Sequence, residues 1–322
     1  MRRIAHVAGL VALLGSLAAN APAEPAAMRW VLLGTMGGPV ASPERSQPAN
    51  LMVRGDDAYL VDCGDGTVEQ LAKAGIRLKS IKAVVLSHLH FDHTGGLAAL
   101  LGLRYQTGVT AKLVIYGPPG TQALVDGLVA SMLPAAEAGY GLPGEPSIAP
   151  SETVTVVEIG DKATFKLGDV SVLARQNTHY SFAPGSDQDR RFKSLAFRFT
   201  SPDRVIAYTG DTGPSTAVEE LARNADLLVS EMIDVPATVA NVKRNTPGMP
   251  DAAMRGLVEH LERHHLTPAQ VGELANRAQV KAVVITHFVS GGADARTVMG
   301  YLAAIAANYR GPAAIGRDLD VY

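Results

Sequence analysis

The chain has 322 residues, of which 47% are hydrophobic and 19% are charged, the balance of an ordinary globular protein. Its formal net charge of −2 excludes a general electrostatic attraction to nucleic acid or to anionic membranes. Cys63 is the only cysteine, which excludes an intramolecular disulfide.

Residues 1–23 have the layout of a secretory signal peptide. Arg2 and Arg3 precede the apolar run Val7–Ala19, and residues 21–23, Ala-Pro-Ala, fit a small-x-small cleavage site. The apolar run is too short to span a bilayer comfortably, and prolines follow it. We therefore expect export to the periplasm or the medium, no stable membrane anchor, and a mature chain of residues 24–322 that forms one domain. The arginine pair leaves the general secretory route and the twin-arginine route both open.

Beyond residue 27, short apolar runs alternate with helical patterns. Strands are expected at 28–35, 50–64 (a hairpin), 82–88, 112–116, 153–159, 161–176, 192–210, 226–230 and 281–286. Helices are expected at 67–75, 96–103, 215–223, 251–264, 268–278 and 294–308. The segment 117–151, rich in glycine and proline, predicts a surface arm or lid, and residues 234–250 predict a loop; both would shape a pocket. Hairpins interleaved with helices indicate an α+β fold of two mixed sheets with helices on their outer faces.

The stretch HLHFDH places four types of metal ligand directly after the apolar strand AVVL. His88 and His90 alternate along an extended strand end and can point toward one ion, while Asp92 and His93 follow in a tight loop and can turn toward a second. Imidazole and carboxylate without thiolate suit Zn²⁺, with Mn²⁺ or Fe²⁺ as alternatives. A histidine-rich surface turn is the other interpretation, and the buried strand in front of the motif argues against it.

Three further residues of ligand type follow predicted strands: His179, Asp211 and His287. Each residue taken alone is better explained as a polar residue whose hydrogen bonds are satisfied at a strand end. Because all three share the placement of His88, we expect the four to lie at the same edge of the sheets. A carboxylate at position 211 could then bridge two ions, and the glycines around it let the backbone turn tightly.

In the order HxHxDH, His, Asp, His, the chain resembles the metallo-β-lactamase fold superfamily. The stretches VDCGDGTVEQL (61–71), GPPGT (117–121) and ADLLVSE (225–231) are similar to its ribonuclease Z branch. LLGTMGGPVASPERSQPAN (32–50) looks like the arylsulfatase-like relatives within that branch. The resemblance covers nearly all of the mature chain and implies an αββα sandwich with a dinuclear metal site. It specifies the substrate much less closely.

The resemblance implies two zinc ions that share one carboxylate. The implied ligands are His88, His90 and His179 for one ion, Asp92, His93 and His287 for the other, and Asp211 as the bridge. The bridging aspartate argues against a β-lactamase, because those enzymes lack it. Asp62 and Asp65 are expected to steady the histidine loop through hydrogen bonds, and Cys63 to be a small buried residue rather than a ligand.

The stretch RHHLTPAQ, residues 263–270, places two histidines before a helix start. Thr267, Pro268 and Gln270 form a capping-box pattern, which holds the preceding residues at the mouth of the helix. His265 lies two residues before the cap. His264, one step further back, is interpreted as a solvated bystander.

The resemblance gives His265 the position of a catalytic acid, and Glu231 in LLVSEM the position of its partner glutamate. Physically, Glu231 would fix the tautomer of the imidazole and raise its pKa, which keeps a proton available. The predicted catalytic residues are therefore Asp92, which is also a ligand, His265 and Glu231. Two solvated histidines on a helical linker are the alternative interpretation.

The expected reaction is the hydrolysis of a small anionic ester. A hydroxide that bridges two ions about 3.5–4 Å apart would attack sulfur or phosphorus, and the acid would protonate the leaving group. The resemblance points to aryl sulfates, and a phosphodiester such as a cyclic nucleotide is the alternative. Weaker alternatives are a lactonase, a β-lactamase, a tRNA 3′ endonuclease and a non-catalytic scaffold. The scaffold is disfavoured because no metal ligand is missing from the sequence.

The region from Leu113 to Asp161 has no lysine or arginine and six acidic residues, a composition that repels a phosphate backbone. We therefore expect a small-molecule substrate and no nucleic-acid partner. Arg190 and Arg191 could steady an anion, although a solvated basic turn explains them better. A homodimer is compatible with the sequence, which does not determine the oligomeric state.

Overall fold

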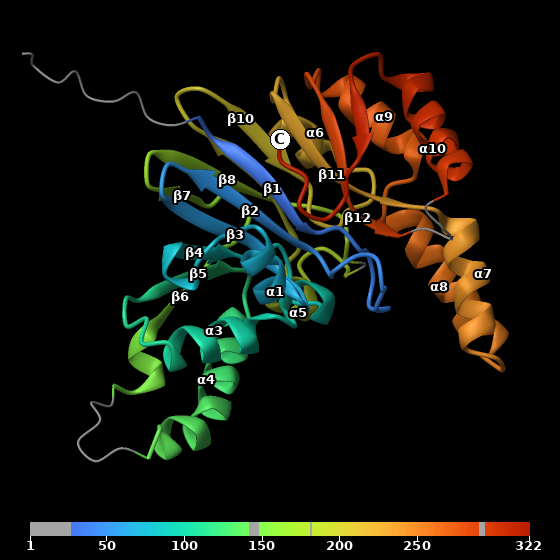
Figure 1. The fold of residues 1–322 in the computed structure, drawn as a ribbon. Coiled ribbons are helices and arrows are strands. Elements are labelled where there is room, and N and C mark those ends of the chain that lie inside the picture. Colours follow the sequence, from blue (N-terminus) through green and yellow to red (C-terminus); the bar gives the residue numbers. More distant parts are fainter. Residues whose placement is uncertain (1–26, 142–147, 181, 290–293) are drawn as a thin grey trace, which may run out of the picture.

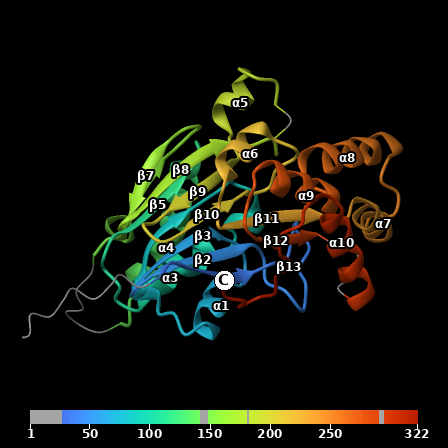
Figure 2. The same ribbon diagram turned by 90° about the horizontal axis from the view of Figure 1, so that it is seen from above.

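Two β-sheets pack face to face, and helices cover the outer face of each sheet (Figure 1; Figure 2). The computed structural model describes residues 27–141, 148–180, 182–289 and 294–322. The expected signal peptide, residues 1–23, lies outside the described residues. The arrangement confirms the predicted α+β class and the αββα sandwich. None of the described helices is long and apolar enough to cross a membrane.

The first sheet has six strands in the order β1-β2-β3-β4-β5-β6. Its strands are β1 (Arg29–Gly34), β2 (Ala49–Arg54), β3 (Asp57–Cys63), β4 (Ile81–Val85), β5 (Leu113–Gly117) and β6 (Val154–Glu158). The first three pair antiparallel, and β3 to β6 pair parallel, so the sheet is mixed. Its outer face is covered by α1 (Thr67–Lys73), α3 (Leu97–Gln106) and α4 (Thr121–Ala138), and the short helix α2 (Phe91–Thr94) precedes α3.

The second sheet has seven strands in the order β13-β12-β11-β10-β9-β8-β7. Its strands are β7 (Thr164–Leu167), β8 (Val170–Gln176), β9 (Leu195–Thr200), β10 (Val205–Tyr208), β11 (Leu227–Ile233), β12 (Val283–Val289) and β13 (Ala313–Ile315). Its outer face is covered by α6 (Thr216–Ala222), α9 (Pro268–Arg277) and α10 (Ala295–Asn308). Three helices lie beyond the sandwich (Figure 2): α5 (Asp187–Arg191), α7 (Val235–Asn245) and α8 (Asp251–His264). Figure 1 shows α7 and α8 side by side, projecting away from the sheets.

The strands are apolar at nearly every position because both of their faces are buried. On β1, Trp30 and Leu32 face the core between the sheets, whereas Val31 and Leu33 pack with the helices outside. Successive side chains of a strand point to opposite faces, so a strand covered on both sides cannot alternate apolar with polar residues. For this reason apolar runs, rather than alternating patterns, identified these strands in the sequence.

Two segments that the sequence predicts to be irregular are helical. Within the predicted arm 117–151, Thr121–Ala138 forms the 18-residue helix α4, whose internal Pro134 obscured the helical pattern. Within the predicted loop 234–250, residues 235–245 form α7. The carboxylate of Asp234 accepts a hydrogen bond from the backbone N–H of Ala237 at 2.9 Å and caps α7. An aspartate followed closely by proline is a helix-start signal that could have identified α7.

Candidate metal centre

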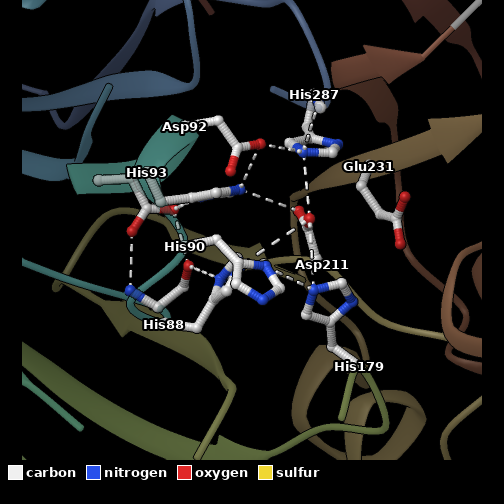
Figure 3. A network of polar contacts seen from close by, with 12 residues as sticks. His88, His90, Asp92, His93, His179, Asp211, Glu231 and His287 are labelled. Atoms are coloured by element: carbon white, nitrogen blue, oxygen red, sulfur yellow. Dashed lines mark hydrogen bonds and ion pairs between the residues drawn. The ribbon is translucent and has the colours of Figure 1, made fainter. Parts of the chain in front are cut away.

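The predicted ligands lie together where the carboxyl ends of strands from both sheets meet (Figure 3). Strand β4 ends at Val85, and His88 and His90 follow in the connection to α2, of which His90 is the N-cap residue. Asp92 and His93 lie on α2 itself. The predicted strand 82–88 was therefore too long, and a turn rather than strand alternation orients the two histidines.

Three imidazoles form the first ligand set: His88, His90 and His179. The Nε2 atoms of His88 and His179 lie 3.0 and 3.1 Å from the same Nδ1 atom of His90. A ring nitrogen has one proton or one lone pair, so it cannot satisfy two such partners equally. Nitrogens at this spacing match the edges of a tetrahedral site, about 3.3 Å for Zn–N bonds of about 2.0–2.1 Å. His90 is exposed and marks the side on which the set opens to solvent.

The second ligand set joins Asp92, His93 and His287 around Asp211. Nε2 of His287 lies 3.4 Å from Oδ2 of Asp92 and 3.1 Å from Oδ2 of Asp211. Nε2 of His93 lies 3.3 Å from Oδ1 of Asp211. Oδ2 of Asp211 also approaches the first set, whose two buried histidines place their Nε2 atoms 3.8 and 4.0 Å away. Asp211 therefore lies between the two sets, where the sequence predicts a bridging ligand.

The chemistry of the two sets fits divalent metal ions. Nε2 of His93 and Oδ1 of Asp211 are buried and have no hydrogen-bond partner among the described residues. Unpaired buried polar atoms are costly, and a cation between two facing ligand atoms would satisfy both. Nitrogen and carboxylate donors without sulfur suit Zn²⁺, with Mn²⁺ and Fe²⁺ as alternatives. The identity and number of the ions stay predictions that this geometry supports.

The two ligand sets differ in their protonation. Burial lowers the pKa of His88 and of His179 well below the ordinary value, so both rings are neutral, which is the form that binds metal. In the second set, burial would lower the pKa of His287, but Asp211 and Asp92 raise it to about 10. Burial would raise the pKa of Asp92, but its histidine neighbours lower it to about 2. A metal ion that enters the second set would therefore compete with a proton on His287.

Asp62 supports the histidine loop from within the core. Its carboxylate accepts hydrogen bonds from the backbone N–H and the Oγ of Ser87, at 2.7 and 2.8 Å, and from the hydroxyl of Tyr208 at 2.6 Å. Its Oδ2 also lies 2.8 Å from Nδ1 of His93. This contact turns Nε2 of His93 toward the site and agrees with the supporting role expected of Asp62.

Four other residues that the sequence singled out do not belong to either ligand set. Asp65 is exposed and hydrogen-bonds none of the described residues, so its predicted supporting role was wrong. Cys63 is fully buried, and burial raises the pKa of its thiol to about 12, as expected of a residue that is not a ligand. Arg190 and Arg191 lie on α5, largely exposed and each 3.7 Å from Asp187, which favours the solvated basic turn over an anion site.

A β-bulge in the second sheet places His287 and Glu231 beside each other. The pairing of β11 with β12 shifts between Ser230 and Met232, so two residues of β12, one of them His287, oppose Glu231 alone. His287 has φ of 41°, and Asp62 has φ of 61°, both in the left-handed region. Such a backbone costs about 1–3 kcal/mol at a residue other than glycine and is concentrated at functional sites.

The predicted acid and its partner form a buried pair. Nδ1 of His265 donates to Oε2 of Glu231 at 2.9 Å and lies 3.1 Å from Oε1. Oε1 also accepts the backbone N–H of Thr212 at 2.8 Å, next to the central Asp211. Burial alone would lower the pKa of His265, but the carboxylate raises it, and burial raises the pKa of Glu231. Because Glu231 holds Nδ1, Nε2 is the atom of His265 that can deliver a proton into the site.

The predicted capping box is present at the start of α9. The backbone N–H of Thr267 donates to Oε1 of Gln270 at 2.9 Å, and Oγ1 of Thr267 accepts the backbone N–H of Gln270 at 3.4 Å. His264 ends α8, and its carbonyl accepts Nδ1–H of His179 at 3.2 Å. Its own Nδ1 donates to the carbonyl of Thr178. His264 is therefore hydrogen-bonded rather than solvated, and its backbone carbonyl helps to orient a ligand; that its side chain is not needed for catalysis stays a prediction.

Sequence reasoning missed two features near the site. His260, one turn before His264 on α8, places its ring centroid 5.6 Å from that of His179. The spacing of four residues on one helix face was a signal that could have found it. Tyr180, which follows a predicted ligand, packs edge-on against His90 with ring centroids 5.3 Å apart. No periodicity or motif in the sequence pointed to Tyr180.

Gly213→Ala is expected to displace the end of α8, and with it His264 and His265. A Cβ at position 213 would lie 1.8 Å from the carbonyl oxygen of Arg263, which belongs to the backbone and cannot move alone. We expect the free energy of unfolding to fall by about 1–3 kcal/mol, measured by chemical denaturation, with a parallel fall in turnover. The matched control is Gly256→Ala on the same helix, where a Cβ meets nothing within 4 Å. Equal behaviour of the two variants would contradict the close packing at position 213.

Residues 58–288 match the family described as Beta-lactamase superfamily domain. The chain is 30% identical over 260 residues to the ribonuclease Z of Mycobacterium sp. (strain KMS), covering 80% of this chain and 83% of that protein. Among solved structures, the metallo-β-lactamase fold protein YhfI from Bacillus subtilis is similar, with a TM-score of 0.64, 19% identity, and 93% and 99% of the two chains covered. Zinc-bound PqqB from Methylobacterium extorquens is similar with a TM-score of 0.59, 15% identity, and 91% and 99% covered. These two structural likenesses concern the fold.

Proposed function

The chain belongs to the β-lactamase superfamily, a family of metal-dependent hydrolases, and from that premise we propose that it hydrolyses small anionic aryl esters, aryl sulfates first. Bound at the two ligand sets, divalent ions would supply a hydrolytic nucleophile at neutral pH and neutralise charge on the ester oxygens. The substrate class then depends on what surrounds these sets.

A row of aromatic rings beside the open edge of the first ligand set carries the proposal of an aryl ester. Tyr180 lies beside His90, the ring of Phe182 lies 5.2 Å from that of Tyr180, and the ring of Phe192 lies 6.0 Å from that of Phe182. Phe182 and Phe192 are 36% and 37% exposed, and Phe91, next to His90 in the chain, is 85% exposed. Exposed aromatic rings that continue from a polar site favour a substrate that pairs an anionic group with an aromatic ring.

The residues of this chain would act on the leaving group. Breaking an ester bond leaves negative charge on the departing oxygen, and a proton supplied there lowers the barrier. We assign this proton to Nε2 of His265, because Glu231 occupies Nδ1 and favours the protonated ring. Glu231 also holds the loop of Asp211 through Thr212, so it positions the acid relative to the ligands.

A phosphodiester is the second candidate, because a relative at 30% identity is a ribonuclease Z. A small phosphodiester is favoured over RNA by the absence of lysine and arginine between Leu113 and Asp161. In that region α4 exposes the carboxylates of Asp126 and Glu137. Electrostatic repulsion between these carboxylates and the phosphates of an RNA would weaken its binding there.

A panel of substrates tests the proposed function. Purified protein is assayed with nitrophenyl sulfate, bis-nitrophenyl phosphate, cyclic AMP, a homoserine lactone, a cephalosporin and a tRNA 3′ precursor. We expect the highest kcat/KM for nitrophenyl sulfate. A higher value for either phosphodiester would select the second candidate, and a higher value for the lactone, the cephalosporin or the tRNA would contradict the small anionic ester.

Phe182→Ala is expected to raise KM for nitrophenyl sulfate about two- to tenfold with little change in kcat, because an aromatic contact contributes about 0.5–1.5 kcal/mol. Steady-state kinetics measure both constants. Met299→Ala is the matched control, since Met299 is a 64% exposed apolar side chain on α10. An unchanged KM in the Phe182 variant would remove the aromatic row from substrate binding.

We further propose that residues 1–23 direct export and are cleaved, which is supported by their charged, apolar and small-residue order. N-terminal sequencing of the protein from the periplasm or the medium should then begin near residue 24. Full-length protein confined to the cytoplasm would contradict this proposal.

A further inference from the structure

His260 lies on the inner side of the last turn of α8, among the rings of three other histidines. Its ring centroid is 5.6 Å from that of His179, 5.2 Å from that of His264 and 5.7 Å from that of His265. One ring nitrogen from each of His179, His260 and His265 lies within 4.8 Å of the others. His260 therefore places another imidazole beside both the proposed acid His265 and the first-set ligand His179.

The other imidazoles of this group are already engaged. Nδ1 of His265 is bound to Glu231, and Nδ1 of His179 is bound to the carbonyl of His264. The ring of His260 is half-buried, and no hydrogen bond joins it to any of the described residues. A half-buried polar ring without such a partner is available to a ligand.

The ring of His260 can donate a hydrogen bond whatever its charge. An imidazole has at least one N–H donor in both its neutral and its protonated form. It can donate a hydrogen bond to an oxygen without transferring its proton. His265 differs from His260, because Nδ1 of His265 is hydrogen-bonded to the carboxylate of Glu231.

We propose that His260 is a further catalytic residue, which donates a hydrogen bond to the leaving-group oxygen while His265 protonates it. Two nitrogens within 4.8 Å of each other can both reach one oxygen between them at about 2.7–3.1 Å. The bond from the central sulfur or phosphorus to this oxygen breaks, the oxygen takes the proton from Nε2 of His265, and His260 keeps its own proton. The assignment rests on the proposed function, because it needs an ester with a leaving oxygen.

The test compares His260→Ala and His260→Asn with wild type on two esters of the class that the panel selects, one with a nitrophenyl and one with an unactivated phenyl leaving group. We expect His260→Ala to lower kcat about tenfold on the phenyl ester and little on the nitrophenyl ester. His260→Asn keeps a donor and should recover most of this loss. Glu259→Ala is the matched control, because this neighbouring side chain is exposed and pairs with Arg263.

Two measurements without turnover complete the test. Phenol, the leaving group itself, should bind to the metal-loaded His260→Ala protein about tenfold more weakly by calorimetry, and elemental analysis should show unchanged metal content. Equal losses on both esters, or unchanged phenol binding, would overturn the assignment. Loss of metal would also overturn it and would make His260 a ligand together with His179 and His265.

Failure of this inference is distinguishable from failure of the proposed function. If His265→Ala shows the dependence on the leaving group and His260→Ala does not, only the role of His260 is wrong. If neither variant shows it, the acid mechanism itself is wrong.

Discussion

Replacing His265 by alanine is expected to lower kcat by about 10²–10⁴-fold on esters with poor leaving groups, and far less on nitrophenyl esters. The reason is the buried pair with Glu231, which holds Nδ1 and leaves Nε2 to deliver the proton. A nitrophenolate leaves readily without a proton, so the acid contributes little there. The measurement is the dependence of kcat on leaving-group pKa, which should be much steeper for the variant than for wild type.

Two further variants separate an acid role from a general disturbance of the site. Glu231→Gln keeps the shape of the partner but removes its charge, so it should give a smaller loss with the same dependence on the leaving group. His264→Ala leaves the backbone carbonyl that holds His179 in place, so its loss should be small and equal for all esters. Equal losses of His265→Ala on good and poor leaving groups would remove the acid role. A leaving-group dependence in His264→Ala would mean that the neighbouring histidine is the acid.

Asp211→Asn is expected to abolish turnover and to lower the metal content from close to two ions per chain to one or none. Asp211 is the carboxylate between the two ligand sets, 3.1 Å from His287 and 3.3 Å from His93, with the first set within 4.0 Å. Asparagine keeps the shape but removes the negative charge that would face both cations. Elemental analysis of the purified protein measures the loss directly and does not depend on the identity of the substrate.

Asp65→Asn is the matched control for Asp211→Asn, because Asp65 is an exposed carboxylate close to the histidine motif in space. Its metal content and turnover should equal those of wild type. Wild-type protein with one ion or none would contradict the dinuclear site. An Asp211→Asn protein that retains both ions would agree with a dinuclear site but would contradict the bridging role of Asp211.

The structure gives the helical hairpin α7–α8 a functional position that the sequence did not indicate. The end of α8 delivers His260, His264 and His265 to the site, and the carbonyl of Arg263 packs against position 213, next to the central carboxylate. A displacement of this one helix would therefore move the proposed acid and the carbonyl that orients His179 together.

The fold class and the candidate ligands could be predicted because their signals are local, whereas the division of the ligands into two sets followed from the family resemblance. An apolar run followed by HLHFDH indicates a strand covered on both faces and a turn of ligands at its end. The capping box of Thr267 and Gln270 located His265 correctly, because a cap involves only residues that are close in sequence. The predictions that Asp65 supports the histidine loop and that His264 is solvated failed because exposure and contacts with distant loops have no local signal.

The sequence by itself determined which side chains can ligate metal, the order in which strands present them, and the pairing of His265 with Glu231. These properties follow from side-chain chemistry, from periodicity and from the resemblance that the motifs carry. Only the tertiary structure decided that Asp211 lies between both ligand sets, that Tyr180 and Phe182 extend from the open edge, and that the ring of His260 lies beside that of His265. Each of these depends on how separate elements pack, through the bulge at His287 and the contact of Gly213 with α8, where residues distant in the chain meet.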